Sequence, residues 1–136
     1  MDHGATVRRF YDLINAGDID GFAGMLADDF VEHEETPGLE PTKEGTLQFF
    51  RMQLAAFPDL HFHAEDILPS GDKVVARARI TGTHQGELMG IPPTGKSVDV
   101  NLIDIIRFGD DGLALEHWGV FDMMAMMQQL GVVPDA

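Results

Sequence analysis

The sequence predicts an α+β fold in which helices come first and an antiparallel sheet follows. Two observations support this prediction. Up to residue 57, apolar residues recur mainly at helical spacing, with one short strand-like stretch among them. From residue 61 onward they alternate with a period of two, in stretches joined by short turns rich in Gly and Asp. Helices followed by hairpin-connected strands are typical of α+β domains.

Two helices are predicted at the start of the chain. The first covers residues 5–15, because its apolar side chains fall on one face at spacings of three and four. These side chains are Val7, Phe10, Tyr11 and Ile14. Gly17 ends this helix. A second, short helix is capped by Asp18 or Asp20 and runs through Leu26.

A short strand and a third helix follow. The strand covers residues 28–33, and the Pro- and Gly-containing stretch after it is expected to be a loop. The third helix runs from about Lys43 to Phe57, where Pro58 stops it.

Four strands and a last helix complete the prediction. The strands are His61–Leu68, Lys73–Gly82, Ser97–Phe108 and Leu113–Phe121, and the helix spans about Met123–Leu130 before Gly131. Such a sheet offers one face to the helices, and strong bending would let it wrap around a cavity.

Composition narrows the function classes. A chain of 136 residues with 44% apolar residues suits a single domain, which we expect to span residues 1–136. The formal net charge of −14 argues against binding nucleic acid or anionic lipid. No apolar run reaches the ~20 residues of a membrane span, and no signal pattern opens the chain, so we expect a cytoplasmic protein. There are no cysteines and therefore no disulfides or thiolate metal sites.

Several motifs along the chain carry a resemblance to a known family. They are Asn15–Asp20, Ala27–His33, Phe57–Asp59, Gly71–Val75, Gly82–Gly86, Pro92–Lys96, and Glu116–Trp118 through Asp122 to Gln129–Gly131. With this order of elements, the chain resembles the SnoaL-like polyketide cyclases of the NTF2-like superfamily. The resemblance implies an NTF2-like (cystatin-like) cone, a bent antiparallel sheet closed by about three to four helices around an internal pocket. It also implies ring closure by aldol chemistry on a polyketide ester, without metal or cofactor.

Asp122 is the first candidate catalytic residue. The resemblance assigns the acid/base role to a carboxylate at this position, and burial would raise its pKa toward neutrality. The alternative is an N-cap of the last helix, because Asp immediately precedes Met123.

His33 and Trp118 are further candidates. His33 ends the first short strand, where the related ketosteroid isomerases carry a catalytic carboxylate, and it could relay protons or remain a strand-end polar residue. Trp118 shares a strand face with Asp122 by parity, so it could desolvate that acid and stack on a flat substrate, or simply pack in the core. Parity places His117 and Phe121 on the opposite face unless a bulge intervenes. Glu34 and Glu35 are expected to be solvated.

Three other residues are expected to line the substrate site. Tyr11 could face the cavity or lie in the core with its hydroxyl satisfied, depending on helix phase. Phe50 comes from the apolar face of the third helix, and His84 follows a strand end near the expected cavity mouth.

Two other chemistries have candidate residues in the sequence. Arg77 and Arg79 with Asp99 and Asp104 could form cross-strand ion pairs, or an acid/base set resembling that of the limonene epoxide hydrolases. His61 and His63 lack a third ligand, so no metal site is expected.

The combined prediction is a SnoaL-like polyketide (ester) cyclase-type enzyme, of cyclase, lyase or isomerase type, that needs no cofactor. Its ligand would be a small apolar carbonyl or polyketide-like molecule. The alternatives are a non-catalytic protein that binds a small apolar ligand, and an epoxide or ester hydrolase that uses the Arg/Asp set. The four methionines between residues 123 and 127 exceed what one buried face needs, which favours a homo-oligomer, a dimer or tetramer.

Overall fold

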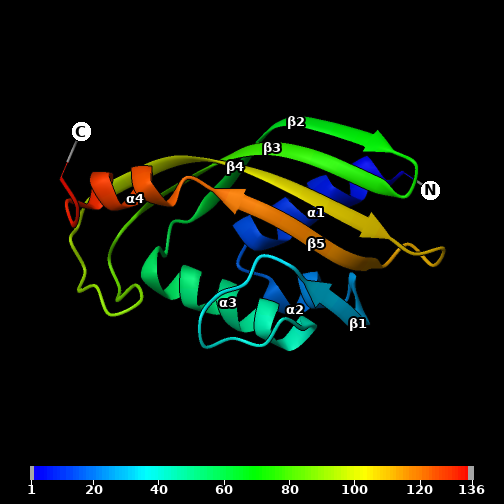
Figure 1. The fold of residues 1–136 in the computed structure, drawn as a ribbon, viewed down its shortest axis with the longest axis horizontal. Coiled ribbons are helices and arrows are strands. Elements are labelled where there is room, and N and C mark those ends of the chain that lie inside the picture. Colours follow the sequence, from blue (N-terminus) through cyan, green and yellow to red (C-terminus); the bar gives the residue numbers. More distant parts are fainter. Residues whose placement is uncertain (1, 135–136) are drawn as a thin grey trace.

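The structure, a computed structural model, describes residues 2–134. Figure 1 shows a bent sheet with helices beneath it and one helix at its end. The elements in chain order are α1 (His3–Asn15), α2 (Ile19–Ala23), β1 (Leu26–Glu32), α3 (Lys43–Ala56), β2 (His61–Ser70), β3 (Lys73–Thr83), β4 (Ser97–Phe108), β5 (Ala114–Phe121) and α4 (Met123–Leu130). The α+β fold is therefore confirmed.

The five strands form one sheet in the order β1-β5-β4-β3-β2. The neighbours from β2 to β5 are antiparallel, as the hairpin turns predict. The pair of β1 and β5 is parallel, with Val31 opposite Glu116 and Glu32 opposite His117. The sheet is thus mixed and not wholly antiparallel, because β1 reaches the sheet edge from the helical layer and not through a hairpin.

The helices α1, α2 and α3 cover one face of the sheet (Figure 1). The helix α1 packs on β2 and β3, and α3 lies against β1 and α2. One cluster of buried apolar side chains joins these elements, and it includes Val7, Phe57 and Val74, which are fully buried. Burial of this layer is the main stabilising contribution to the fold.

Asn15 fixes the end of α1 against the sheet edge. Its side-chain oxygen accepts a hydrogen bond from the Phe62 amide at 2.7 Å, and its side-chain nitrogen donates to the Phe62 carbonyl at 3.0 Å. These bonds satisfy backbone groups of the edge strand β2 that would otherwise be open to another chain. They also set the position of α1, and therefore of Tyr11, over the sheet.

The element boundaries differ from the prediction by a few residues. The clearest correction is at Leu26, which opens β1 and does not end the second helix. A backbone turn after Ala23 ends α2 early, because Met25 N donates to Phe22 O at 3.0 Å. Within residues 2–134, none of the helices combines the length and the hydropathy that a membrane crossing would need.

Candidate functional site

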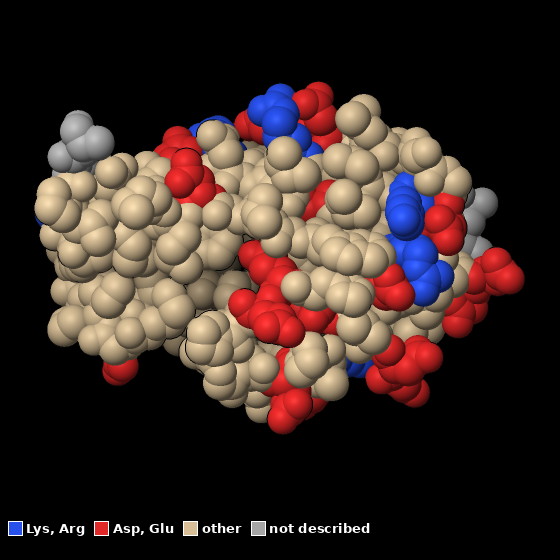
Figure 2. Space-filling view, in the orientation of Figure 1, with Lys and Arg blue, Asp and Glu red and all other residues tan. Residues whose placement is uncertain are grey.

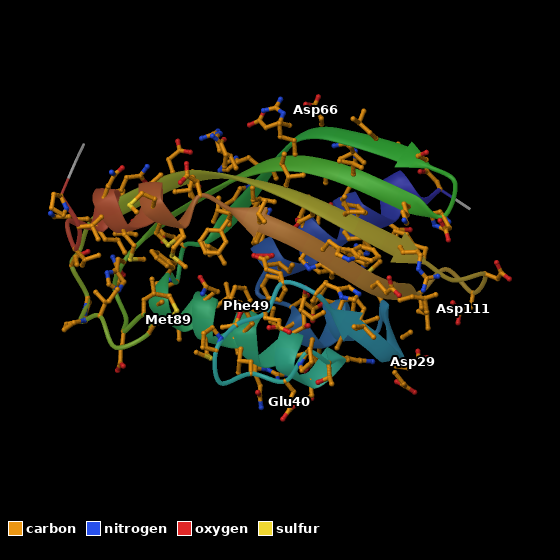
Figure 3. The ribbon with its side chains drawn as sticks, viewed as in Figure 1. Asp29, Glu40, Phe49, Asp66, Met89 and Asp111 are labelled. Carbon is orange, nitrogen blue, oxygen red and sulfur yellow. The ribbon has the colours of Figure 1, made fainter. Side chains whose placement is uncertain are left out.

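A pocket lies between the sheet and the helices α1 and α3. Its volume is about 120 Å³, and its wall is mostly aromatic and aliphatic. In Figure 2, acidic side chains border a hollow on this face of the molecule. Figure 3 shows Phe49 of α3 reaching into the space beneath the sheet, whereas Asp29 of β1 points away from it. A mostly apolar pocket with a few converging polar groups is the usual form of a small-molecule site.

Four polar side chains at the wall of the pocket form a continuous hydrogen-bonded network, called here the polar cluster. The Tyr11 hydroxyl donates to Asp104 Oδ2 at 2.7 Å. The two ring nitrogens of His117 contact Asp104 Oδ1 at 2.7 Å and Glu32 Oε1 at 2.6 Å. These side chains come from α1, β4, β5 and β1, so the polar cluster connects four elements.

His117 in the polar cluster is protonated at neutral pH. Burial would lower the pKa of its imidazole, but the hydrogen bonds and charges of Asp104 and Glu32 outweigh burial and raise the pKa to about 10. Both ring nitrogens therefore donate, each to a carboxylate. Burial, and then the charge of Asp104, raise the pKa of Tyr11 above its ordinary value, so its hydroxyl stays neutral and donates.

Glu34 lies beside the polar cluster, and its carboxyl group, unlike those of Asp104 and Glu32, is not hydrogen-bonded within it. Its backbone amide donates to Glu32 Oε1 at 2.9 Å, but among residues 2–134 its carboxyl group has no hydrogen-bond partner. Burial raises the pKa of this carboxyl to about 7; His117 opposes the shift, and Asp104 and Glu32 add to it. Glu34 therefore changes protonation state near neutral pH, in contact with an apolar pocket. The expectation that Glu34 is solvated is wrong, because the segment after β1 folds back over the pocket.

Gly119 makes room for this arrangement. It lies opposite Asp104 in the β4–β5 ladder. A Cβ atom at Gly119 would lie 2.5 Å from Glu34 Oε2 and 2.8 Å from both Asp104 Oδ1 and His117 Cε1. These distances are shorter than van der Waals contact, so only glycine lets the three side chains converge at this point.

The same three side chains could in principle offer ligands to a metal ion. One donor atom each from Glu34, Asp104 and His117 lie within 4.8 Å of one another. Both nitrogens of His117 already donate to carboxylates, however, and a metal ligand must be a deprotonated imidazole nitrogen. A metal would have to displace the bond between His117 and Asp104.

Asp122 lies at the start of α4 and not in the pocket wall. Its side chain is exposed and accepts a hydrogen bond from Ala125 N at 3.0 Å, which is the geometry of an N-cap. Strand parity does not extend to this residue, because β5 ends at Phe121.

His33 and Trp118 lie outside the pocket, on the other face of the sheet. Their rings stack with centroids 4.7 Å apart and planes 6° apart. Parity is kept along β5, so Trp118 and His117 point to opposite faces, as predicted. The pocket, however, is on the side of His117 and Phe121. The expectation that Trp118 faces the cavity was wrong because parity does not reveal which face the helices cover.

The remaining predicted residues divide into two groups. Tyr11 and Phe50 line the pocket. His84 is fully buried away from it, where Nδ1 accepts a hydrogen bond from Thr94 N at 3.2 Å and the ring packs on Phe57. Its position reflects the packing of the long β3–β4 connection and not a cavity mouth.

Of the expected cross-strand ion pairs, only the one between Arg79 and Asp99 forms within the described part of the chain. Arg79 binds Asp99 at 2.7 Å and Glu65 at 3.2 Å, and Arg77 binds Asp66 at 2.7 Å. Asp104 lies on the opposite face of β4 from Asp99 and joins the pocket instead. The set of two Arg and two Asp side chains therefore does not come together.

The sequence predicts Asp104 only as a member of that set, and His117 only by its strand face. The available signal was their position in apolar strands, Asp104 among Leu102, Ile103, Ile105 and Ile106. A charged residue in such a run needs a partner, but the sequence does not identify that partner. The sequence gives no comparable signal for Glu34, because two other acidic residues, Glu32 and Glu35, lie close to it.

This fold and pocket define a class of small α+β proteins with a mostly apolar cavity under a bent sheet. The family model of SnoaL-like polyketide cyclase matches residues 5–130. The chain belongs to the SnoaL-like polyketide cyclase family.

Two relatives are named as cyclases. The aklanonic acid methyl ester cyclase DauD of Streptomyces sp. (strain C5) is 26% identical over 128 residues, which cover 92% of this chain and 79% of DauD. DnrD of Streptomyces peucetius, which has the same description, is also 26% identical over 128 residues, covering 92% of this chain and 88% of DnrD.

Solved structures agree with this assignment. IdmH of Streptomyces antibioticus, described as a proposed polyketide cyclase, is 33% identical with a TM-score of 0.84, covering 96% of this chain and 99% of IdmH. AclR of Streptomyces galilaeus, described as a proposed hydroxylase, is 32% identical with a TM-score of 0.89, covering 99% of this chain and 84% of AclR. The cyclase prediction is thus favoured over the ligand-binding and hydrolase alternatives. AclR also shows that similar chains carry descriptions of different reactions.

Proposed function

We propose that this protein closes a ring in a polyketide-type ester by cofactor-independent acid/base chemistry, with Glu34 as the group that moves the proton. The observation that carries the proposal is the state of the Glu34 carboxyl. It lines an apolar pocket, has no hydrogen-bond partner among residues 2–134, and has a pKa raised to about 7 by burial. An acid/base group works best when its pKa is near the working pH.

Asp104 and His117 are already engaged with each other, whereas Glu35 and Glu40, which also line the pocket, are exposed. Asp104 accepts two hydrogen bonds, and His117 donates two. Their proposed role is electrostatic. The imidazolium of His117 offsets part of the negative charge of Asp104 and Glu32, and so limits the repulsion that a developing enolate would meet in the pocket. Tyr11 and Phe50 supply part of the wall that would hold a flat, apolar substrate.

The proposed reaction balances without an added reagent. The Glu34 carboxylate takes a proton from the carbon next to a carbonyl, which leaves an enolate. The enolate carbon forms a bond to a second carbonyl carbon of the same molecule, and that carbonyl oxygen becomes an alkoxide. Protonated Glu34 returns the proton to the alkoxide. The product is therefore an isomer of the substrate.

The expected substrate class follows from the pocket and from the relatives. The pocket wall contains five carboxylates and no Lys or Arg among residues 2–134, so a neutral ester fits better than a free acid. Two relatives are named for cyclising a methyl ester. We therefore propose an apolar ester with two carbonyl groups within reach of each other.

The family resemblance supports a competing assignment, in which Asp122 moves the proton, and His33 is a candidate proton relay because of its place at the strand end. Asp122 is an exposed helix cap, and the side chain of His33 is 39% exposed on the other face of the sheet. Neither residue is in the pocket wall. This geometry favours Glu34.

Turnover of a polyketide-type methyl ester tests the two assignments directly. Product is detected as an isomer of unchanged mass, and exchange of the α-proton in D₂O is followed by NMR. We expect Glu34→Gln to lose both signals, and Asp122→Asn to keep them. Asp29→Asn, an exposed carboxylate on β1, is the matched control. Full turnover by Glu34→Gln together with loss by Asp122→Asn would reverse the assignment.

We also propose that the protein assembles as a homo-oligomer. The support is a set of large apolar side chains left exposed in the single chain: Val120 at 71%, Met124 at 62% and Ile103 at 46%. Ile103 and Val120 are partners on adjacent strands, so they form one patch. Light scattering of the purified protein should give a dimer or tetramer mass. A Val120→Asp variant should lower that mass, and a monomer mass for the wild type would contradict the proposal.

A further inference from the structure

Where β1 ends, beside the middle of β5, side chains are paired on both faces of the sheet. On the pocket side, Glu32 contacts His117 at 2.6 Å. On the outer side, the next residue of each strand forms the stack of His33 on Trp118. The parallel register explains this, since Glu32 lies opposite His117 and the following residues are neighbours in turn. The end of β1 is therefore held to β5 on both faces of the sheet.

The outer pair has further contacts that keep it in place. His33 Nε2 lies 3.7 Å from Glu116 Oε2, and Glu116 Oε1 accepts a hydrogen bond from Arg107 at 3.1 Å. The Lys73 ammonium lies 5.5 Å from the centre of the Trp118 ring, within the range of a cation–π interaction. These contacts explain why an exposed His and a half-buried Trp stay stacked on the sheet surface.

Glu34 depends on this arrangement more than the other pocket residues do. It is the first residue after His33, and its carboxyl group has no hydrogen bond of its own within the described chain. Within residues 2–134, two hydrogen bonds from backbone amides hold this segment. His33 N donates to His117 O at 2.9 Å, and Glu34 N donates to Glu32 Oε1 at 2.9 Å. Beyond it the chain leaves the sheet.

We infer that His33 and Trp118 are a positioning pair, whose stack on the outer face holds the Glu34 carboxyl over Gly119 in the pocket. The inference rests on the proposed function for the importance of Glu34, but the stack and its geometry do not depend on that function. The two residues act through the backbone at residues 33–34 and touch no substrate. Loss of the stack would let the segment after β1 move outward and expose Glu34 to water.

The test measures the titration of Glu34 in the protein without substrate, by NMR of ¹³C-labelled Glu carboxyls assigned with Glu34→Gln. Trp118→Ala and His33→Ala should each lower the Glu34 midpoint by about one pH unit or more, a tenfold change in the ionisation constant. Trp118→Phe keeps an aromatic ring and should retain the wild-type midpoint. Leu68→Ala, which removes an exposed apolar side chain from β2, is the control and should also leave it unchanged.

The outcomes separate the inference from the proposed function. An unchanged midpoint in both alanine variants would overturn the positioning role, whatever the activity of Glu34→Gln. If Trp118→Ala does not fold, the exposed His33→Ala decides alone. A lowered midpoint in the alanine variants with a retained one in Trp118→Phe supports the inference, even if Glu34→Gln keeps full turnover and the proposed function fails. Equal shifts in Leu68→Ala would show a general loosening and would also overturn it.

Discussion

A single carboxyl group, that of Glu34, makes the pocket responsive to pH. Its pKa is raised to about 7, mainly by burial, so the carboxylate that removes a proton forms as pH rises through neutrality. We expect kcat to increase with pH between about 6 and 8, because the base form grows tenfold per unit below the pKa. The Glu34→Gln variant should lose roughly 10²–10⁴-fold in kcat and the pH dependence with it. A flat profile in the wild type over this range would argue against Glu34 as the base.

Asp122 shows how a residue type can fit two roles. Because its carboxylate accepts from Ala125 N, we expect Asp122→Ala to lower the free energy of unfolding by about 1 kcal/mol. Asn is an equally good N-cap, so Asp122→Asn should be close to wild type in urea denaturation. A large loss of turnover in Asp122→Asn without loss of stability would instead support a direct chemical role.

Gly119 is the residue where packing and chemistry meet. A methyl group there would push against Glu34, Asp104 and His117 at once. We expect Gly119→Ala to cost on the order of 1–3 kcal/mol of stability, as overpacking does, and to reduce turnover more than a similarly destabilising core change. Ala76→Gly, at a fully buried position on β3, serves as the comparison. Turnover lowered equally in both variants would mean that Gly119 matters only for stability.

At the scale of elements, His117 joins β5 to β1 and β4 through its two carboxylate partners. Its pKa is raised from 6.5 to about 10, so its contribution to stability is fully present below pH 6.5 and is lost as pH rises through 10. The wild-type free energy of unfolding should therefore fall over this range. His117→Gln should flatten that fall and should cost up to roughly 3–5 kcal/mol at neutral pH, because two buried carboxylates lose their partner.

The exposed His61 provides the control for this measurement. His61→Gln should keep the wild-type dependence of stability on pH, since His61 lies on the surface of β2. If His117→Gln and the wild type lose stability in parallel between pH 6.5 and 10, then His117 is not the group responsible.

The elements themselves were largely predictable from local pattern. The strand Ser97–Phe108 and the helix Met123–Leu130 have the predicted bounds, because period-two and cap signals are local. Parity within β5 was also right for Trp118 and His117. The side of the sheet that the helices cover was not predictable in this way, since it depends on how α1 and α3 pack. Because the covered side of the sheet was not known, the expected site was placed on the wrong face of the sheet.

At the scale of the whole molecule, the polar cluster depends on residues far apart in the sequence. Tyr11 and Asp104 are 93 residues apart, and Glu32 and His117 are 85 apart. No spacing motif links such positions, so the sequence alone could nominate Tyr11 but not its partner. The family resemblance predicted the overall fold, which the comparisons confirm. It did not identify this cluster.

The occupied nitrogens of His117 lead to a prediction about metals. We expect dialysis against EDTA to leave both turnover and the melting temperature unchanged, because an imidazolium between two carboxylates is not a metal ligand. Activity that is lost on chelation and restored by Zn²⁺ or Mn²⁺ would instead favour a site formed by Glu34, Asp104 and His117.

The titration of the Glu34 carboxyl in the wild-type protein tests the central claim most directly, because it needs no substrate. ¹³C NMR of labelled Glu side chains, with Glu34→Gln for assignment, should give a midpoint near 7. Such a value means that a buried carboxyl, without a hydrogen-bond partner among residues 2–134, is available for proton transfer in the pocket. A midpoint near the ordinary 4.5 would mean that Glu34 is solvated, and it would contradict the proposed acid/base role.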